Sequence, residues 1–264
     1  MNSDSQRPTS LPKLAIVPAL NESGSIAEVV AAIRRLAPEF DVLVIDDASH
    51  DDTDDLARAA GATVLRHRFN LGIGGAMQSG YRWAHIHGYG IAVQVDGDGQ
   101  HDPASIGPLE RLLRDSGVDL VWGSRFLETP GYRVPRGRRA GGILFSRLLS
   151  AITGERISDP TSGFRMTNRR GIELFARDYP HDFPEVEAIL MVHAHDMSMR
   201  EVPVRMRERQ AGRSSIGGLR PAYYMARVLL AVFIGLFRRR PLPPLDDDWL
   251  ALSPADTLEI AEQA

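Results

Sequence analysis

The stretch IAVQVDGDGQHDP, residues 91–103, bears on both the fold and the chemistry. Four of its first five residues are apolar, which is typical of a strand buried on both faces. The run ends at Asp96, and Asp98 and Gln100 follow within four residues. Carboxylates this close repel one another, so their clustering here needs an explanation. Three explanations fit: a bound cation, phosphate chemistry that needs a cation, or a plain acidic turn.

Similar apolar runs recur along the chain, and segments with helical spacing alternate with them. The predicted strands are residues 13–20, 41–49, 62–67, 91–96 and 118–126. The predicted helices are residues 25–37, 51–61, 74–88 and 103–117. Apolar strands alternating with helices indicate a parallel sheet covered on both faces. We therefore predict a Rossmann-like, doubly wound α/β domain with a mostly parallel sheet, whose ligands bind at the carboxyl ends of the strands.

Polar and acidic residues follow three of these strands. They are Asn21 and Glu22 after the first, Asp46 and Asp47 after the second, and Asp96 and Asp98 after the fourth. Because the carboxyl ends of parallel strands meet at one edge, we expect these side chains to converge there. For Asp46 we favour a role in capping the next helix through its neighbours over direct contact with a ligand.

Composition excludes several classes of protein. The chain has 264 residues, 43% of them hydrophobic and 25% charged, which suits one globular domain with a tail. The net charge of -3 excludes the overall basic excess of a nucleic-acid binder, and no cysteine is present for disulfides or thiolate metal sites. Residues 1–12 are polar and predicted to be a flexible terminus without a secretory signal, so we expect a cytoplasmic protein.

The alternation of strands and helices stops near Leu127, and the segments that follow are expected to pack over the rim of the sheet. The most apolar segment, residues 219–240, ends in Arg238–Arg240. Its uncharged core of 10 residues is too short to span a bilayer, which takes about 20. We predict amphipathic helices at the membrane interface here, with a buried core helix as the alternative, and an acidic tail over residues 241–264.

Other chemistries for the acidic stretch fail on spacing. A calcium EF-hand loop counted from Asp96 would need glycine where His101 stands and glutamate where Gly107 stands. A dinucleotide fingerprint and a Walker lysine are also missing. What remains is a D-x-D site in which Asp96 and Asp98 hold Mg²⁺ or Mn²⁺ against a diphosphate, with the Asp/Gly turn as the alternative. Gly97 would let the backbone approach such a ligand closely.

Six motifs, in this order, carry a resemblance to a known family: VPALNES, VIDDASHDDT, NLGIGGAMQSGYRWA, VQVDGDGQHDP, GSRF and DPTSGFR. Together they resemble the family 2 glycosyltransferases of GT-A fold, most closely the branch of dolichyl-phosphate mannose synthase and other polyprenyl-phosphate glycosyltransferases. The resemblance covers about residues 13–215, and it implies a GT-A domain over residues 13–218.

The resemblance implies roles for particular residues. Those expected at the nucleotide sugar are Pro18, Ala19, Asn21, Glu22, Asp47, Asp96 and Gly97. Those expected at the metal are Asp96, Asp98 and Gln100. Those expected at the acceptor phosphate are Arg125, Arg139 and Arg213. Arg138 is the alternative to Arg139, because the loop that carries both can be aligned with the family in either register. Those expected to carry catalysis are Asp98, Arg125, Asp159 and Arg165. Asp159 could orient either Arg165 or the acceptor. His101 could bind the metal itself, or it could support a residue that does.

The function that the resemblance implies is a metal-dependent, inverting transfer of a hexose from a GDP- or UDP-linked sugar to a polyprenyl phosphate. It would act peripherally at the cytoplasmic face of the membrane, and a membrane-embedded partner subunit is a further hypothesis. One alternative is a soluble transferase acting on a sugar or protein hydroxyl, with a general base such as Glu187 or Glu185. Another is a non-catalytic nucleotide-sugar-binding subunit of a membrane complex.

Overall fold

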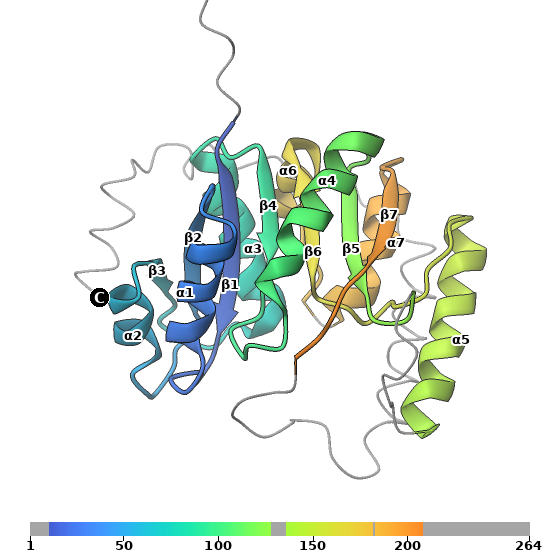
Figure 1. The fold of residues 1–264 in the computed structure, drawn as a ribbon. Coiled ribbons are helices and arrows are strands. Elements are labelled where there is room, and N and C mark those ends of the chain that lie inside the picture. The colour runs from blue at the N-terminus through green and yellow to red at the C-terminus, as the bar shows by residue number, and fades with distance from the viewer. Residues whose placement is uncertain (1–10, 128–135, 182, 208–264) are drawn as a thin grey trace, which may run out of the picture.

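The computed structural model describes residues 11–127, 136–181 and 183–207. One sheet of seven strands runs through it, with helices on both faces (Figure 1). The strands are β1 (Lys13–Ala19), β2 (Phe40–Asp46), β3 (Thr63–Arg66), β4 (Ile91–Gln94), β5 (Leu120–Ser124), β6 (Arg165–Asn168) and β7 (Met199–Pro203). The helices are α1 (Ile26–Leu36), α2 (Thr53–Ala59), α3 (Gly72–Ile86), the 3-10 turn η1 (Pro103–Ser105), α4 (Ile106–Ser116), α5 (Arg136–Thr153), α6 (Arg169–Arg177) and α7 (Pro184–Ala194).

The strand order is β3-β2-β1-β4-β6-β5-β7. All pairs are parallel except those of β6, which lies antiparallel between β4 and β5. The predicted mostly parallel α/β sheet is confirmed. The expectation for the segments after Leu127 is wrong in part, because β6 and β7 complete the sheet and do not pack over its rim.

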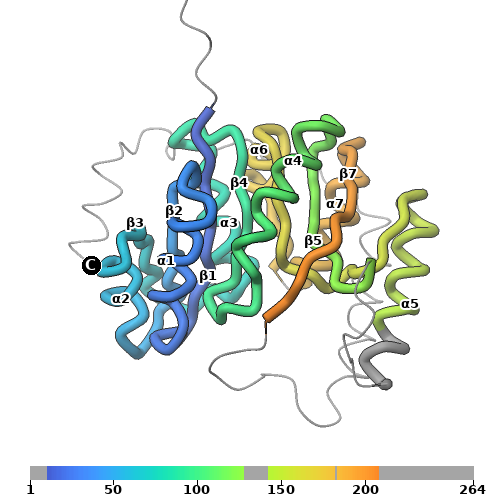
Figure 2. Tube along the Cα trace, in the orientation of Figure 1, coloured from blue at the N-terminus to red at the C-terminus, as the bar shows by residue number. Residues whose placement is uncertain are grey.

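Two apolar clusters sandwich the sheet, because strand residues point alternately to its two faces. Leu14 and Ile16 of β1 pack with residues of α3, α5, α6 and α7, whereas Ala15 and Val17 pack with residues of α1, α2 and α4. Figures 1 and 2 show α1 and α4 in front of the sheet and α3 behind it. Burial on both faces explains why the strands have nearly continuous apolar sequences.

The carboxyl ends of β1, β2, β4 and β5 lie along one edge of the sheet, the lower edge in Figure 1. At the opposite edge, Asp119 ties β5 to its neighbours. Its carboxylate accepts hydrogen bonds from Asn168 Nδ2 at 3.0 Å and from the Ser198 amide at 2.9 Å, and it pairs with Arg170. Burial by itself raises the pKa of Asp119, but these hydrogen bonds and Arg170 outweigh it, so the pKa lies below its ordinary value.

We predict that Asp119→Asn lowers the free energy of unfolding by about 1–3 kcal/mol at pH 7, because one acceptor oxygen becomes an NH₂ group that opposes the donors there, and the ion pair with Arg170 is lost. A depressed pKa contributes stability above the ordinary Asp range, and that stability is lost as the pH falls through the folded-state pKa. The gap between wild type and variant in urea unfolding should therefore narrow below about pH 4. Asp115→Asn, at an exposed position on α4, is the control. An equal effect of both substitutions would contradict the role of Asp119.

Candidate active site

The turns after β1 and β2 are joined by side-chain hydrogen bonds. Asn21 has a φ of 55°, in the left-handed region that asparagine tolerates better than most residues. Its backbone N–H donates to Ser49 Oγ at 2.9 Å, and its side-chain Oδ1 accepts from the backbone N–H of His50 at 2.8 Å. The Glu22 amide donates to Thr53 Oγ1 at 2.9 Å. These bonds hold both turns together at the carboxyl edge, with Asn21 exposed there.

The D-x-D loop after β4 is joined to β1 in turn. The Gly97 amide lies 3.3 Å from the Pro18 carbonyl oxygen, and Ser25 Oγ donates to the Gly97 carbonyl at 2.8 Å. The carbonyl of Ala19 accepts from the Asp47 amide at 2.9 Å. A Cβ atom at position 97 would lie 3.0 Å from the Pro18 oxygen, which explains the glycine. Three predicted nucleotide-binding residues, Pro18, Ala19 and Gly97, therefore meet at one place.

Asp46 stabilises the turn that follows it and does not cap α2. Its Oδ1 accepts from the Ser49 amide at 3.0 Å, and its Oδ2 lies 3.3 Å from Arg66 Nε. The N-cap of α2 is Asp52, which makes no side-chain capping bond. The Asp46 carboxylate is engaged by its own turn and by Arg66 of β3, and a role in capping through its neighbours stays a prediction.

Asp47 anchors the start of α3. Its Oδ1 accepts from the Leu71 amide at 2.8 Å and contacts His67 Nδ1 at 2.8 Å, while its Oδ2 accepts from the Gly72 amide at 2.8 Å. A carboxylate is favoured at a helix N-terminus, where backbone amides are unpaired. Only 4% of Asp47 is exposed. Its contact with a nucleotide stays a prediction.

Asp96 is supported by neighbours on both sides. Its Oδ1 accepts from Gln94 Nε2 at 3.0 Å, and its amide donates to His101 Nδ1 at 3.0 Å. A neutral imidazole that accepts at Nδ1 carries its proton on Nε2, and this atom lies 3.5 Å from Asp96 Oδ2. His101 is buried and stacks on Phe164 with ring centroids 4.7 Å apart. Of the two roles considered for His101, the structure supports the second, in which His101 supports the predicted metal ligand Asp96.

Asp98 lies deeper in the same loop. Its Oδ1 accepts from the Gln100 amide at 3.0 Å, and the Gln100 carbonyl accepts from the Arg207 amide at 2.8 Å. The side chain of Asp96 is 35% exposed, and Asp98 is 9% exposed. Within the described ranges, no group of three or more His, Asp or Glu side chains is arranged to hold a metal ion. Metal binding by Asp96, Asp98 and Gln100 stays a prediction, and it would need further oxygen ligands from a phosphate.

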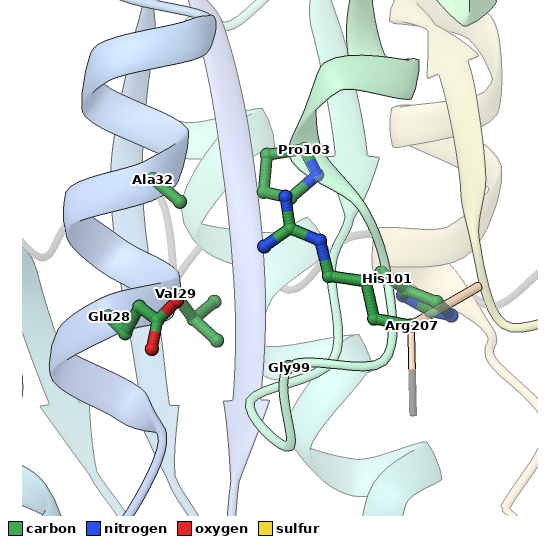
Figure 3. A pocket seen from close by; sticks show the side chains of 7 residues that line it. All are labelled: Glu28, Val29, Ala32, Gly99, His101, Pro103 and Arg207. Atoms are coloured by element: carbon green, nitrogen blue, oxygen red, sulfur yellow. The ribbon is translucent and has the colours of Figure 1, made fainter. Parts of the chain in front are cut away.

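A small pocket lies on the α1 side of the D-x-D loop (Figure 3). Its lining residues are Glu28, Val29, Ala32, Gly99, His101, Pro103 and Arg207. Arg207 Nη2 pairs with Asp102 Oδ1 at 2.8 Å. The predicted nucleotide-binding residues do not line this pocket, which borders the D-x-D loop at Gly99 and His101.

Arg125 and Asp159 form a two-pronged ion pair beyond β5. Arg125 Nε lies 2.6 Å from Asp159 Oδ2, and Arg125 Nη2 lies 2.6 Å from Asp159 Oδ1 and 2.7 Å from Thr161 Oγ1. The side chain of Asp159 is fully buried, whereas that of Arg125 is 19% exposed. Of the two roles left open for Asp159, orienting Arg165 is not what the structure shows, because the carboxylate is bound to Arg125, and contact with the acceptor stays a prediction.

Arg165 lies beneath the rim and is 2% exposed. Its Nη1 donates to the Pro184 carbonyl at 3.0 Å, and its Nη2 donates to the Ser162 carbonyl at 3.1 Å. It thus braces the start of α7 against the loop before β6. Direct contact of Arg165 with an acceptor stays a prediction.

Glu185, in the first turn of α7, carries a carboxyl whose pKa lies above its ordinary value. Burial raises the pKa of Glu185; Arg165 lowers it, Asp96 raises it and Arg125 lowers it. These charged groups are close enough to influence one carboxyl. A Cβ atom at Gly163 would lie 3.4 Å from Asp96 Oδ2, so the loop before β6 also touches the D-x-D residues. The loop before β6 therefore links Asp96, which it touches at Gly163, with Arg125, which it holds through Asp159.

Several expectations concern parts of the chain that are not described. Arg213, the interfacial helices over residues 219–240 and the acidic tail lie outside the described residues, as do the side chains of Arg138 and Arg139 at the start of α5. Sequence reasoning missed His67, which pairs with Asp47, and Glu201, which accepts from the Asp159 amide at 3.0 Å. The sequence signal at Glu201 was weak, because it is one of two adjacent charged residues in the short strand MREVP.

The sequence profile of Glycosyl transferase family 2 matches residues 14–175, more than half of the chain. The chain therefore belongs to this family and is a glycosyltransferase. The predicted family is confirmed.

Two named relatives cover most of the chain. An undecaprenyl-phosphate mannosyltransferase from Micrococcus luteus is 33% identical over 219 residues, 78% of this chain and 87% of the relative. A polyprenol monophosphomannose synthase from Mycolicibacterium smegmatis is 32% identical over 229 residues, 80% of this chain and 83% of the relative. The predicted likeness to polyprenyl-phosphate glycosyltransferases is confirmed.

Among solved structures, glucosyl-3-phosphoglycerate synthase from Mycobacterium tuberculosis, in complex with Mn²⁺, UDP and glucosyl-3-phosphoglycerate, is similar in fold. The TM-score is 0.60 at 23% identity, over 85% of this chain and 79% of that chain. The predicted GT-A type fold is confirmed. In the part of the chain that the structure describes, no helix combines the length and the apolar character needed to cross a bilayer.

We predict that Gly97→Ala weakens nucleotide binding. The added methyl group would meet the Pro18 oxygen at 3.0 Å and Ala19 Cβ at 3.3 Å, and overpacking of this kind costs about 1–3 kcal/mol. The affinity for a nucleoside diphosphate with Mn²⁺, measured by calorimetry, should fall about tenfold. Gly107→Ala on α4 is the control, because nothing lies within 4 Å of its added Cβ. Unchanged affinity in Gly97→Ala would contradict the placement of the nucleotide at this loop.

Proposed function

We propose that this glycosyltransferase moves a hexose from a nucleotide diphosphate sugar to a polyprenyl phosphate, with inversion at the anomeric carbon. The observation that supports it best is that the D-x-D residues, after β4, and Arg125, held by Asp159 after β5, lie at the same edge of the sheet. The names of the relatives support a lipid phosphate as the acceptor, since they act on undecaprenyl phosphate and polyprenol phosphate by their names.

The D-x-D residues fit a hard divalent cation such as Mg²⁺ or Mn²⁺. Asp96 and Asp98 supply carboxylate oxygens from one loop, and Asp96 is partly open to solvent. Mg²⁺ is commonly bound by one or two carboxylates together with substrate phosphates, which is the set that Asp96 and Asp98 could complete. When bound, the cation would neutralise charge on the leaving nucleoside diphosphate. The similar solved structure holds Mn²⁺ together with UDP.

The chain's own residues would position the donor and the acceptor. The joined turns at Asn21 and Gly97 would hold the nucleotide beside Asp96. Arg125, held by the Asp159 carboxylate, would bind the acceptor phosphate through charge-assisted hydrogen bonds. A phosphate oxygen would then attack the anomeric carbon while the bond from that carbon to the diphosphate oxygen breaks on the opposite face. Because the Arg125 side chain is already held, less rotamer freedom is lost when it binds a phosphate.

A phosphate acceptor also explains why a strong general base is not needed. A phosphate monoester has a second pKa of about 6, so its oxygen is already a nucleophile near neutral pH. A sugar or protein hydroxyl would need a base, and Glu185 or Glu187 of α7 would be the candidates. Action at the cytoplasmic membrane face, through residues 219–240 or a membrane-embedded partner, is part of the proposal, since the acceptor is a lipid.

Asp98→Asn should abolish metal-dependent transfer, lowering turnover on the order of 10²–10³-fold, while the protein stays folded. The reason is that a rim carboxylate contributes charge at the leaving group and little to the core. Asp96→Asn should also be severe. Asp55→Asn, at an exposed position on α2, is the control. Normal turnover by the Asp98 variant with Mg²⁺ or Mn²⁺ would refute the metal assignment.

Two variants distinguish an enzyme that uses a phosphate acceptor from one that uses a hydroxyl acceptor. Arg125→Lys keeps a charge for Asp159 but lacks the two-pronged geometry, so the rate on a short-chain polyprenyl phosphate should fall about 10–100-fold. Glu187→Gln should cost no more than a few-fold, because no proton must be abstracted. Free polyprenol is the acceptor control and should not react.

The opposite pattern would favour the alternative function. If an unphosphorylated sugar were the acceptor and Glu187→Gln abolished its turnover, with no transfer to the lipid phosphate, the enzyme would be a hydroxyl-directed transferase. The third hypothesis, a non-catalytic subunit, would be refuted by any metal-dependent hydrolysis of the donor.

A further inference from the structure

Glu201 lies on β7, directly beside Trp122 of β5 in the parallel register. Its Oε1 accepts from Trp122 Nε1 at 2.9 Å, from the Ser158 amide at 2.8 Å and from the Asp159 amide at 3.0 Å. Its Oε2 accepts from Ser158 Oγ at 2.8 Å. All of these partners donate, and a carboxylate is the side chain that can only accept. Glu201 therefore holds the backbone of the loop that carries Asp159.

One branch of this network ends beside Arg125. Because the Ser158 hydroxyl donates to Glu201, the Ser158 oxygen must accept from the Ser124 hydroxyl, 2.6 Å away. Ser124 Oγ in turn accepts from the Phe126 amide at 3.2 Å. The carboxylate of Glu201 thus sets the direction of the two hydroxyl hydrogen bonds, at Ser158 and Ser124, that lead from β7 to the peptide that follows Arg125.

The second branch ends on Arg125 itself. Glu201 holds the Asp159 amide, and the Asp159 carboxylate accepts from the Arg125 amide at 3.1 Å and from its guanidinium at 2.6 Å. Asp159, which Glu201 positions, therefore holds both the backbone and the side chain of Arg125. Glu201 itself pairs with β5 at Trp122, two residues before Ser124, the last residue of that strand.

We propose that Glu201 is a positioning residue for the transfer reaction, acting through Asp159 on Arg125. This inference rests on the proposed function, in which Arg125 binds the acceptor phosphate. Glutamine at this position keeps the size of the side chain but replaces one acceptor oxygen with a donor. The new NH₂ group would oppose the donors at Ser158 or Asp159, or it would force the Ser158 hydroxyl to turn and reverse the chain toward Ser124.

The kinetic test is a double-mutant cycle with Glu201→Gln and Arg125→Ala. Glu201→Gln should keep nucleoside diphosphate affinity but lower turnover on polyprenyl phosphate on the order of a hundredfold, the cost of a misplaced group. In the Arg125→Ala background the same change should cost almost nothing, because Glu201 acts through Arg125. Independent, multiplying losses would overturn the proposal. Glu155→Gln, at an exposed position in the same connection, removes the same charge as a control.

A second measurement does not depend on activity. In Glu201→Gln, the amides of Ser158, Asp159 and Phe126 should exchange hydrogen faster, and the indole N–H signal of Trp122 should shift. Unchanged exchange and an unchanged indole signal would overturn the proposed network. Wild-type protein that fails to glycosylate polyprenyl phosphate would instead refute the proposed function, and the exchange result would still decide whether Glu201 holds the loop.

Discussion

The site depends on the parallel pairing of β1 with both β2 and β4. Parallel pairing brings the carboxyl ends of the three strands to the same edge, so their following turns can be joined. Asn21 bonds to the turn after β2, and Gly97 bonds to the end of β1. A shift in either register would separate the D-x-D loop from the residues expected at the nucleotide.

The opposite wall of the site is built from segments distant in sequence. β6 runs antiparallel between β4 and β5, which carries the loop at Gly163 next to Asp96. In the same loop, Asp159 binds Arg125. Arg165, which follows the loop, donates a hydrogen bond to the start of α7. The D-x-D carboxylates and the Arg125 guanidinium, which Asp159 holds, lie along the same edge of the sheet, and this set suits a reaction in which a leaving diphosphate and an anionic acceptor must both be accommodated.

Periodicity and turn residues were sufficient to predict the first five strands, the helices between them and the D-x-D loop. They were not sufficient for β6 and β7, because an antiparallel insertion between two parallel strands leaves no local signal in the sequence. Side-chain partners were the least predictable feature. Asp159 binds a residue 34 positions away, and Asp47 binds amides 24 and 25 positions away. Pairings of this kind follow from the tertiary fold, and so the partners of Asp46 and Asp159 could not be predicted from the sequence.

The central claim is that the sugar is transferred to a lipid phosphate. The direct measurement is to incubate the protein and Mg²⁺ or Mn²⁺ with membranes and a panel of nucleotide sugars labelled in the sugar, and then to extract the lipids. The account predicts that one label enters the lipid extract and is released by mild acid, as expected for a glycosyl phosphate. Label that is transferred but found only in water-soluble or protein-bound products would contradict it.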